Sequence, residues 1–402
     1  MNILLVTDSY PPEIKSASHL MQELAEELVT RGYRVVVVTS YPQYNLANNM
    51  KDKTFNVYSH ENGVEIIRVK TLPHHNVNLL IRGISELLLP YLYYWQVRKF
   101  VQKVDVVISY SPPLTLGIAC LKVIKRYKAR YIMNLQDIFP QNAIDIGKIN
   151  NPLLVKFYET IERKIYTNAD IITTHSKSVT RFIIEKKRVS SKKVVTLHNW
   201  IDFHSFENLN KNLSFKKAYG LENKFIILFA GVIGYCQGLG LIIDIAKSIK
   251  RFEDIVFLIV GDGAEKKKLQ EQVKRESLKN IIFKDFVSKE DYPYLAKSVD
   301  VGLVCLHPDN KTPIVPGKIL GYMAASIPVI AFVNRESDAH ELIKDAQCGC
   351  SAISDDSNIM VDTVVKMYKE RDRLKEYGKN GFKYVSEHFS TEVCTDNLVK
   401  LF

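Results

Sequence analysis

The sequence predicts an α/β fold with two doubly wound parallel sheets in tandem, and three observations support this class. The chain has 402 residues, 46% of them hydrophobic and 25% charged, as expected of a globular protein. Short runs rich in Val, Ile and Leu alternate with helix-like segments in both halves. Because a single core seldom grows beyond about 250–300 residues, we expect two domains. We place them at 1–205 and 206–380, with a polar linker over 206–213 and a C-terminal helix over 381–402 that crosses back to the first domain.

The expected strands are unbroken β-branched runs of the kind found in sheets that are buried on both faces. Helices lie between them, and the first helix shows a stripe of Leu20, Leu24 and Leu28 before a stop at Gly32. Two such sheets place a ligand cleft between the domains, at the carboxyl ends of the strands. The expected strands lie at 3–6, 35–39, 64–69, 104–109, 131–135, 171–174 and 194–197, and then at 225–230, 256–260, 281–283, 301–304 and 328–331.

The segment 315–331 carries the strongest functional signal in the chain. Pro316 fixes the backbone, Gly317 lets the main chain approach a ligand, and Lys318 brings a positive charge to the first turn of a helix. The first N–H groups of a helix have no partner within it, so a phosphate would satisfy them. The alternative is an ordinary capped surface helix.

A glycine-rich turn after the strand at 225–230 strengthens the phosphate interpretation. Strand, glycine-rich turn and helix is the order of a phosphate cradle, although this turn lacks the lysine and hydroxyl of a P-loop. A second tight turn follows the strand at 256–260. Together with the segment around Lys318, these turns indicate a phosphate site in the second half. Their candidate binding residues are Gly231, Gly234, Gln237, Gly261 and Gly263.

Positive charge is concentrated in the first half of the chain. Residues 1–205 hold 27 Lys and Arg against 17 Asp and Glu, which accounts for +10 of the net charge of +11. An anionic membrane surface and a nucleic acid are the candidate partners. The aromatic segment 79–95 has cations on both flanks but is interrupted by Arg82 and Pro90, which suits an interfacial segment better than a spanning helix. The alternative is a core helix, and without an aromatic-basic recognition module we expect no nucleic-acid partner.

Other features of the sequence exclude several classes of protein. The six cysteines have neither zinc nor redox spacing, and Met1 leads directly into the first strand without a signal peptide. No Asp-x-Asp follows a strand, so we expect no metal. No GxGxxG follows the strand at 3–6, which argues against a nicotinamide enzyme. We expect a cytoplasmic protein that is peripheral on the inner face of the cytoplasmic membrane.

In order and spacing, the motifs of the whole chain resemble those of bacterial glycosyltransferases of family 4. That family has the GT-B architecture, in which two Rossmann-like domains face each other across a cleft. The resemblance is nearest to the branch that includes N-acetylfucosamine transferases of surface-polysaccharide synthesis. The matching elements are 3–12 with Glu13, 136–140, Ala169 and Asp170 with Ser176, 198–202, 231–234 with Gln237 and Gly238, 260–263, 300–306 and 315–331.

The resemblance implies transfer of a sugar from a nucleotide diphosphate, with retention at the anomeric carbon and without a cofactor. It implies a UDP-linked N-acetylated hexosamine or deoxyhexosamine as donor, and a lipid-linked or glycan acceptor of O-antigen or capsule synthesis. Lys318 would stabilise the leaving diphosphate, and Asp137 would orient or deprotonate the acceptor hydroxyl unless it merely caps a helix. Further donor-binding residues would be Phe286, Val287, Tyr322, Glu336 and Glu341, and acceptor-binding residues would be Glu13, Lys15, Ser16 and Ser18.

The sequence departs from the family pattern in two places. Many members carry two carboxylates that hold hydroxyls of the donor sugar and the ribose, but the corresponding positions here are Pro313 and Gly321. The usual cations near the glycine-rich turn are also replaced, one of them by Gln237, which leaves Lys318 as the principal cation for the diphosphate. The alternative function is therefore a catalytically silent GT-B subunit or a scaffold of a polysaccharide assembly complex.

Overall fold

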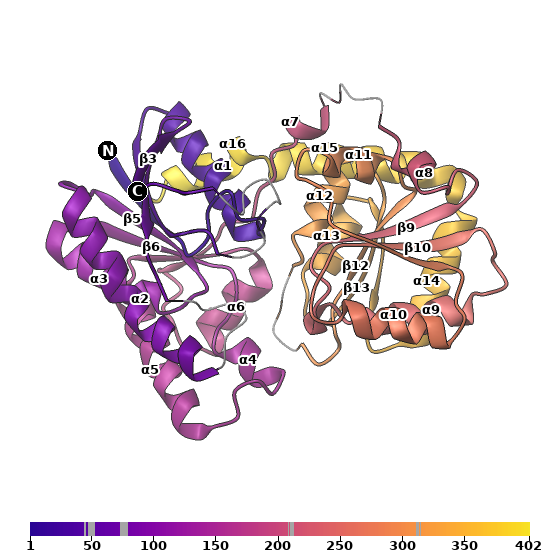
Figure 1. Ribbon diagram of the computed structural model, residues 1–402, viewed down its shortest axis with the longest axis horizontal. Helices are drawn as coiled ribbons and strands as arrows, with labels where there is room; N and C mark the ends of the chain where they lie inside the picture. The colour runs from indigo at the N-terminus through magenta and orange to yellow at the C-terminus, as the bar shows by residue number, and fades with distance from the viewer. Residues whose placement is uncertain are drawn as a thin grey trace. The chain divides into compact units, whose positions relative to one another are not determined.

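The computed structural model describes residues 1–43, 46, 53–72, 79–207, 209, 213–310, 313 and 315–402, without the side chains of 79–82. The chain forms two compact units (Figure 1). Unit 1 comprises Met1–Trp200 and Thr391–Phe402, and unit 2 comprises Ile201–Ser390. Each unit has its own sheet with helices on both faces.

Unit 1 contains an eight-stranded sheet in the order β3-β4-β2-β1-β5-β6-β7-β8. Neighbouring strands are parallel except at the edge, where β3 is antiparallel to β4. Because β1 has apolar side chains on both faces, it is buried in the centre of the sheet. The strands are β1 (Asn2–Val6), β2 (Arg34–Ser40), β3 (Tyr58–Glu61), β4 (Val64–Val69), β5 (Val106–Ser111), β6 (Arg130–Leu135), β7 (Ile171–Thr174) and β8 (Val194–Thr196).

The helices of unit 1 divide between the two faces of this sheet. α2 (Leu79–Phe100), α3 (Leu116–Tyr127), α5 (Pro152–Asn168) and α6 (Lys177–Glu185) supply one core, while α1 (Ser16–Thr30) and α16 (Thr391–Val399) supply the other. α4 (Gln141–Asp145) is a short helix between β6 and α5. Arg31 at the end of α1 donates to the carboxylate of Asp396 and, at 2.9 Å, to the carbonyl of Glu392. These bonds fasten the C-terminal helix to unit 1.

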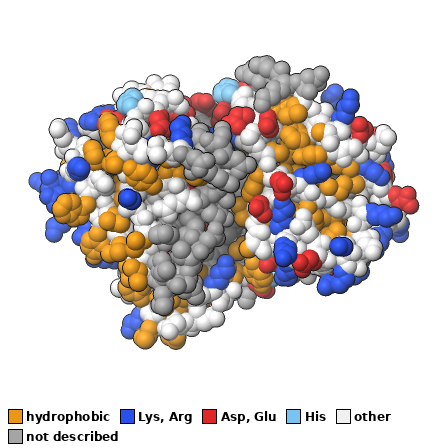
Figure 2. All heavy atoms as spheres, viewed as in Figure 1, with side chains coloured by type: hydrophobic (Ala, Val, Ile, Leu, Met, Phe, Trp, Pro, Cys, Tyr) orange, Lys and Arg blue, Asp and Glu red, His pale blue; other side chains and the backbone are white. Residues whose placement is uncertain are grey.

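α2 has one face in the core, as the core-helix alternative requires. Leu89, Tyr93 and Val97 are buried, and the Tyr93 hydroxyl lies 3.0 Å from the carbonyl oxygen of Thr7, to which it donates. Figure 2 shows hydrophobic side chains, with Lys and Arg beside them, on the part of unit 1 where Figure 1 draws α2, α3 and α5. Within the described residues, no helix combines the length and the apolar character needed to cross a membrane.

Unit 2 contains a six-stranded parallel sheet in the order β11-β10-β9-β12-β13-β14. Its strands are β9 (Phe225–Ala230), β10 (Ile255–Val260), β11 (Ile281–Lys284), β12 (Val301–Cys305), β13 (Val329–Val333) and β14 (Gly349–Ile353). One face packs on α11 (Tyr292–Lys297), α12 (Lys318–Ala324), α13 (Ala339–Asp345) and α15 (Leu374–His388), and the other on α9 (Gly240–Ser248), α10 (Lys266–Arg275) and α14 (Ser357–Lys369). The shorter helices are α7 (His204–Glu207), α8 (Phe215–Ala218), η2 (Tyr235–Gln237) and η3 (Arg371–Arg373).

The predicted fold class is confirmed, and the differences lie at boundaries and edges. β5 begins two residues after the predicted start at 104, and the edge strands β3 and β14 were not predicted. Within the predicted linker 206–213, Phe206 belongs to α7 and is buried in the core of unit 2, whereas Glu207 and Leu213 are exposed. The division between the units falls at Trp200 and Ile201, and the C-terminal segment contains two helices, since α15 ends at His388 and α16 begins at Thr391.

Candidate functional site

In unit 2, the turns after β9 and β12 meet at the carboxyl edge of the sheet. β9 lies in the centre, with β10 on one side and β12 on the other, so the sheet order reverses here. Open α/β sheets bind ligands at such a switch point. The N–H of His307 donates to the carbonyl of Cys236 at 2.9 Å and so joins the two turns. Gly238 permits this approach, because its φ is 60° and a Cβ there would lie 2.8 Å from the Cα of His307.

Glycines also bring the turns after β9 and β10 into backbone contact. Gly231, Gly261 and Gly263 have φ values of 140°, 148° and 154°, which side chains rarely tolerate. A Cβ on Gly261 would lie 1.8 Å from the carbonyl oxygen of Gly231. Gly234 differs, because its φ is −118° and the nearest atom to a Cβ there would be 3.9 Å away. Gly261 and Gly263 are therefore required by the packing of the turns, whereas Gly231 is favoured by its positive φ and has the Lys318 side chain as its neighbour.

Lys318 extends from the start of α12 into the space beside Gly231. A Cβ on Gly231 would lie 2.7 Å from Cε of Lys318. The ammonium donates to Oε1 of Gln237 at 3.3 Å and lies 5.1 Å from the centre of the Phe229 ring. Desolvation by burial lowers the pKa of Lys318 to about 8, and no carboxylate within the described residues pairs with it. α12 has only seven residues, so the positive charge comes mainly from Lys318 rather than from the helix terminus.

The structure brings Lys318, Gly231 and Gln237 together, but it does not connect all the predicted donor-binding residues to them. Pro316 is buried and Gly317 is exposed, directly before Lys318. Within the described part of the chain, Lys318 has no hydrogen bond or ion pair with the remaining candidates. These are Phe286, which is exposed, Val287, which is half-buried, and the exposed Glu336 and Glu341 near the start of α13.

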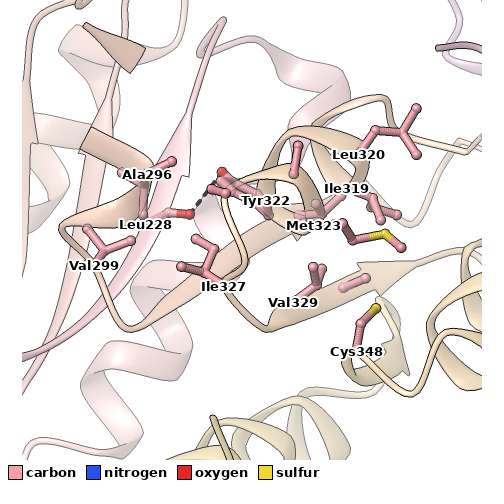
Figure 3. Close-up of a cluster of buried hydrophobic side chains, with 14 of the residues drawn as sticks. Leu228, Ala296, Val299, Ile319, Leu320, Tyr322, Met323, Ile327, Val329 and Cys348 are labelled. Atoms are coloured by element: carbon pink, nitrogen blue, oxygen red, sulfur yellow. Dashed lines mark hydrogen bonds between the residues drawn. The ribbon is translucent and has the colours of Figure 1, made fainter. Parts of the chain in front are cut away.

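Tyr322 is wrong as a donor-binding prediction, because its side chain belongs to the core. It is 0% exposed, and its hydroxyl donates to the carbonyl of Leu228 at 3.0 Å and accepts from the N–H of Ala230 at 3.1 Å. Figure 3 shows the first of these bonds, with the tyrosine among apolar side chains of α12 and the strands. The ring also lies against Gly302, where a Cβ would come within 2.2 Å of it.

Tyr292 lies against Gly321, one of the two positions at which the sequence departs from the family pattern. A Cβ on Gly321 would lie only 2.8 Å from the Tyr292 hydroxyl oxygen, so a glutamate there would collide with the ring. Burial raises the pKa of Tyr292. Pro313, at the position of the first carboxylate, is buried. The glycine at position 321 thus leaves room for the Tyr292 ring, a contact that was not predicted from the sequence.

A second missed feature is a polar aromatic cluster beside the glycine-rich turn. The rings of Tyr235 and His307 stack with their centres 4.4 Å apart. The Tyr235 hydroxyl donates to Oδ2 of Asp309 at 3.1 Å, and the N–H of Asp309 donates to Nδ1 of His307 at 3.2 Å. In the sequence, this cluster could have been predicted only from the position of His307 and Asp309, which follow a strand that ends at the switch point.

In unit 1, Asp137 lies directly after β6, at the carboxyl edge of the sheet. Burial raises the pKa of its carboxyl group. Within the described residues its side chain has no hydrogen bond or ion pair, and Pro140 rather than Asp137 occupies the cap position of α4. The hydroxyls of Ser111, the last residue of β5, and Thr115, just before α3, also have no partner within the described residues, but they have no access to solvent. Asp137 is partly exposed, so its carboxylate can bind a polar ligand.

An amide network fixes the backbone next to Asp137. Gln136 donates to the side-chain oxygens of Asn134 at 2.6 Å and Asn199 at 2.7 Å, and Asn199 donates back to Gln136 at 2.7 Å. The network therefore joins the end of β6 to the segment after β8. It holds the residue before Asp137 from two sides.

Two of the four predicted acceptor-binding residues are buried within unit 1. Glu13 is 4% exposed, and its carboxylate accepts from Oγ of Ser9 at 2.7 Å and the N–H of Gln43 at 2.8 Å. Ser18 is 0% exposed within α1. Both predictions are corrected, because the Glu13 carboxylate is held by its own loop and the Ser18 hydroxyl has no access to solvent. Lys15 is partly exposed and lies 3.2 Å from Glu13, and Ser16 is exposed.

Comparisons with known proteins agree with this class of fold. Solved structures similar over the whole chain include sucrose-phosphate synthase from Thermosynechococcus elongatus, with a TM-score of 0.77, 14% identity and 98% of that chain covered. Another is HepE from Anabaena in complex with UDP, with a TM-score of 0.74, 14% identity and 99% of that chain covered. Two α/β domains, each built on a largely parallel sheet, define the GT-B class of glycosyltransferases.

Family models match both units. "Glycosyl transferase 4-like domain" matches residues 17–200, and "Glycosyl transferases group 1" matches residues 211–384. A relative from Escherichia coli K12, named "Putative colanic acid biosynthesis glycosyl transferase WcaI", is 26% identical over 343 residues, which is 81% of either chain. The chain is therefore a glycosyltransferase with the GT-B fold, in agreement with the resemblance to family 4. Membership of the N-acetylfucosamine-transferase branch stays a prediction.

Proposed function

We propose that the protein transfers a sugar from a UDP-linked donor to a lipid-linked or glycan acceptor of surface-polysaccharide synthesis. The donor sugar that the resemblance implies is an N-acetylated hexosamine or deoxyhexosamine. The name of the WcaI relative supports a role in polysaccharide synthesis, and the UDP bound to HepE, which has the same fold, supports the nucleotide.

The observation that carries the proposal is the position of Lys318 beside Gly231. A partly desolvated ammonium without a described carboxylate partner is suited to bind an anion that enters the same space. In a sugar transfer, negative charge grows on the diphosphate as it departs. A cation aimed at those oxygens stabilises the transition state more than the ground state, which is the condition for catalysis.

On the acceptor half of the reaction we assign Asp137 the task of orienting the attacking hydroxyl. Its raised pKa makes the carboxylate a stronger hydrogen-bond acceptor than an exposed aspartate, which suits it to hold that hydroxyl in place. Lys15 and Ser16 remain the proposed acceptor contacts on the loop after β1.

We propose that the anomeric configuration is retained by front-face transfer. The bond from the anomeric carbon to the diphosphate oxygen breaks, the acceptor oxygen forms the new bond on the same face, and its proton passes to the departing diphosphate. The proposal rests on the sequence, which has Pro313 and Gly321 where many family members carry carboxylates, because a double displacement requires a nucleophilic carboxylate on the far face of the sugar. An α-linked donor then gives an α-linkage.

The direct test is to incubate the purified chain with a panel of nucleotide sugars and polyprenyl-diphosphate-linked acceptors. Mass spectrometry identifies the product, and proton NMR coupling at the new anomeric centre gives its configuration. We expect one UDP-sugar to react and the configuration to be kept. An inverted product would contradict front-face transfer while leaving the fold assignment intact.

A catalytically silent GT-B subunit is the second candidate function. It is favoured by one observation, namely that neither Pro313 nor Gly321 can supply the carboxylates that many relatives use. Binding of UDP without transfer or hydrolysis of any UDP-sugar, across all acceptors, would select this candidate over the enzyme.

A further inference from the structure

The solvent-facing side of α2 is apolar, which is the reverse of the usual surface helix. Its exposed residues recur at the spacing of a single helix face, while the opposite face packs in the core. Trp95 is 70% exposed, and two cations, Arg98 and Lys99, continue the same face. The apolar members of this face are Ile84, Leu87, Leu88, Tyr91, Leu92 and Trp95.

α5 extends this surface, although it lies far from α2 in the sequence. The Tyr158 hydroxyl donates to Oε2 of Glu86 at 3.1 Å, which brings the first turns of α5 beside α2. There Leu153, Leu154 and Phe157 are exposed, Leu153 to 80%. We call these residues, together with the six apolar residues of α2, the apolar face. Figure 2 shows hydrophobic side chains with Lys and Arg among them over the region of α2 and α5.

Cations surround the aromatic part of the apolar face. Lys122 of α3 lies 4.9 Å from the centre of the Tyr91 ring, and Arg98 lies 5.8 Å from that of Trp95. Lys99 and Lys156 are exposed on the same two helices. The acidic residues of these two helices that adjoin the face, Glu86 and Glu159, are only partly exposed, and Glu86 accepts the bond from Tyr158. The face therefore presents apolar and positive groups together.

We propose that the apolar face docks on an anionic lipid bilayer. Aromatic rings beside Lys and Arg are the composition that settles at the boundary of headgroups and acyl chains, where the rings enter the apolar layer and the cations meet lipid phosphates. A second copy of the chain fits less well, because a symmetric contact would set the same cation-edged face against itself without acidic partners. The net charge of +10 over residues 1–205 adds long-range attraction to the same membrane.

The test is flotation of the full chain with phosphatidylcholine vesicles that contain or lack phosphatidylglycerol. It needs no sugar transfer, so its outcome is independent of the proposed enzymatic function, which UDP binding and product formation test separately. We expect the protein to float with the anionic vesicles and to be released at about 1 M salt, where the Debye length is only about 3 Å. Flotation with neither kind of vesicle, or equally with both, would overturn the proposal.

Matched variants locate the surface. The triple change Leu87→Gln, Tyr91→Gln and Trp95→Gln should weaken partition to anionic vesicles at least about a hundredfold, because three apolar side chains no longer enter the lipid. The control Ile359→Gln, at an exposed apolar residue of unit 2, should bind as the unchanged protein does. Unchanged thermal unfolding of both variants shows that the fold is retained, since all four side chains are exposed.

Charge variants separate the electrostatic part of docking. Arg98→Gln with Lys99→Gln should weaken partition about tenfold to thirtyfold, given the contribution of each cation near an anionic surface. The control pair Lys274→Gln and Arg275→Gln removes the same charge from exposed positions on α10 and should have little effect. Equal losses in both pairs would overturn the proposed surface. So would lipid-free self-association that the triple change abolishes, because the occupant would then be a second copy.

Discussion

The turn after β1 and the turn after β9 occupy the same place in two similar sheets, but they are filled differently. In each sheet this turn follows the central strand, where the strand order reverses. After β9, Gly231 leaves space that is taken by the side chain of Lys318. After β1, Ser9 donates to Glu13 at 2.7 Å and Thr7 donates to the carbonyl of Ser9 at 3.0 Å. The turn after β9 therefore offers the Lys318 ammonium and backbone groups, whereas the turn after β1 is filled by its own side chains, which bond one another.

This difference indicates that unit 2 is better suited than unit 1 to bind an anion. Polar groups that already bond one another gain little from a ligand, whereas a desolvated cation without a described carboxylate partner gains a great deal. We therefore assign the diphosphate to unit 2. In unit 1, Asp137 after β6 is partly exposed and its side chain has no partner within the described residues, so we assign the acceptor chemistry to the end of that strand.

The largest expected effect comes from Asp137→Asn, which tests the unit 1 side of this comparison. If the carboxylate acts on the acceptor hydroxyl, kcat should fall about 10²–10⁴-fold, while the affinity for UDP should not change. Asp145→Asn on α4 is the matched control and should leave both quantities near their original values, since the bond that Asp145 accepts from Gln141 is local to α4. A loss of UDP affinity in Asp137→Asn would break the division of roles between the units.

Lys318→Met tests the unit 2 side. Removing an electrostatic stabiliser of the leaving group should lower kcat/KM about 10²–10³-fold, and UDP should no longer raise the thermal unfolding temperature. Lys268→Met is the control, because Lys268 is exposed on α10 and lies 3.1 Å from Glu265. Near-normal turnover by folded Lys318→Met would remove the assignment of the diphosphate to this turn.

Gly231→Ala makes the turn after β9 more like the turn after β1, because it places a side chain in the glycine-lined turn. The φ of 140° disfavours alanine, and the new Cβ would press on Lys318, so we expect a loss of about 1–3 kcal/mol in the free energy of unfolding, as for other strained backbones. Gly234→Ala meets open space at a negative φ and should stay within about 0.5 kcal/mol. Urea unfolding of both variants provides the measurement, and equal losses would show that space beside Lys318 is not the reason for Gly231.

Most of the fold could be predicted from the sequence, because buried parallel strands are continuous apolar runs. Strand β9 was predicted with its observed limits. The edge strand β14 was missed, since it begins Gly-Cys-Ser and has no such run, and β3 was missed because it is polar and exposed. The C-terminal crossing to α1 depends on contacts such as Arg31 with Asp396, which are distant in sequence and carry no local pattern.

The candidate site was predictable where backbone geometry needs glycine, and much less so where burial decides. Gly231, Gly261 and Lys318 lie together because strand ends and turns fix them. Tyr322 was misassigned because a tyrosine next to a phosphate motif resembles a ligand-binding residue. In the structure its hydroxyl donates to a strand carbonyl in the core. Tyr292 was missed because its proximity to Gly321 arises from the packing of α11 against α12, which sequence spacing does not reveal.

The smallest expected effect is a pH dependence that distinguishes the two turns. Burial lowers the pKa of Lys318 to about 8, so the unliganded ammonium is mostly charged below pH 8 and mostly neutral above it. Bound diphosphate favours the charged form and raises this pKa, so the affinity for UDP should be constant below pH 8 and fall above it by up to about tenfold per pH unit.

In the absence of ligand, the contribution of Lys318 to the free energy of unfolding changes with pH in the opposite direction. The unfolded chain binds more protons at this residue between pH 8 and the ordinary value of 10.5, so its contribution to stability increases with pH across that window. Calorimetric titration with UDP from pH 7 to pH 10 measures the first effect, and Lys318→Met should abolish it, while Asp137→Asn should keep it. The same slope in Lys318→Met would mean that another group binds the diphosphate, and the contrast between the two turns would no longer explain which unit holds the donor.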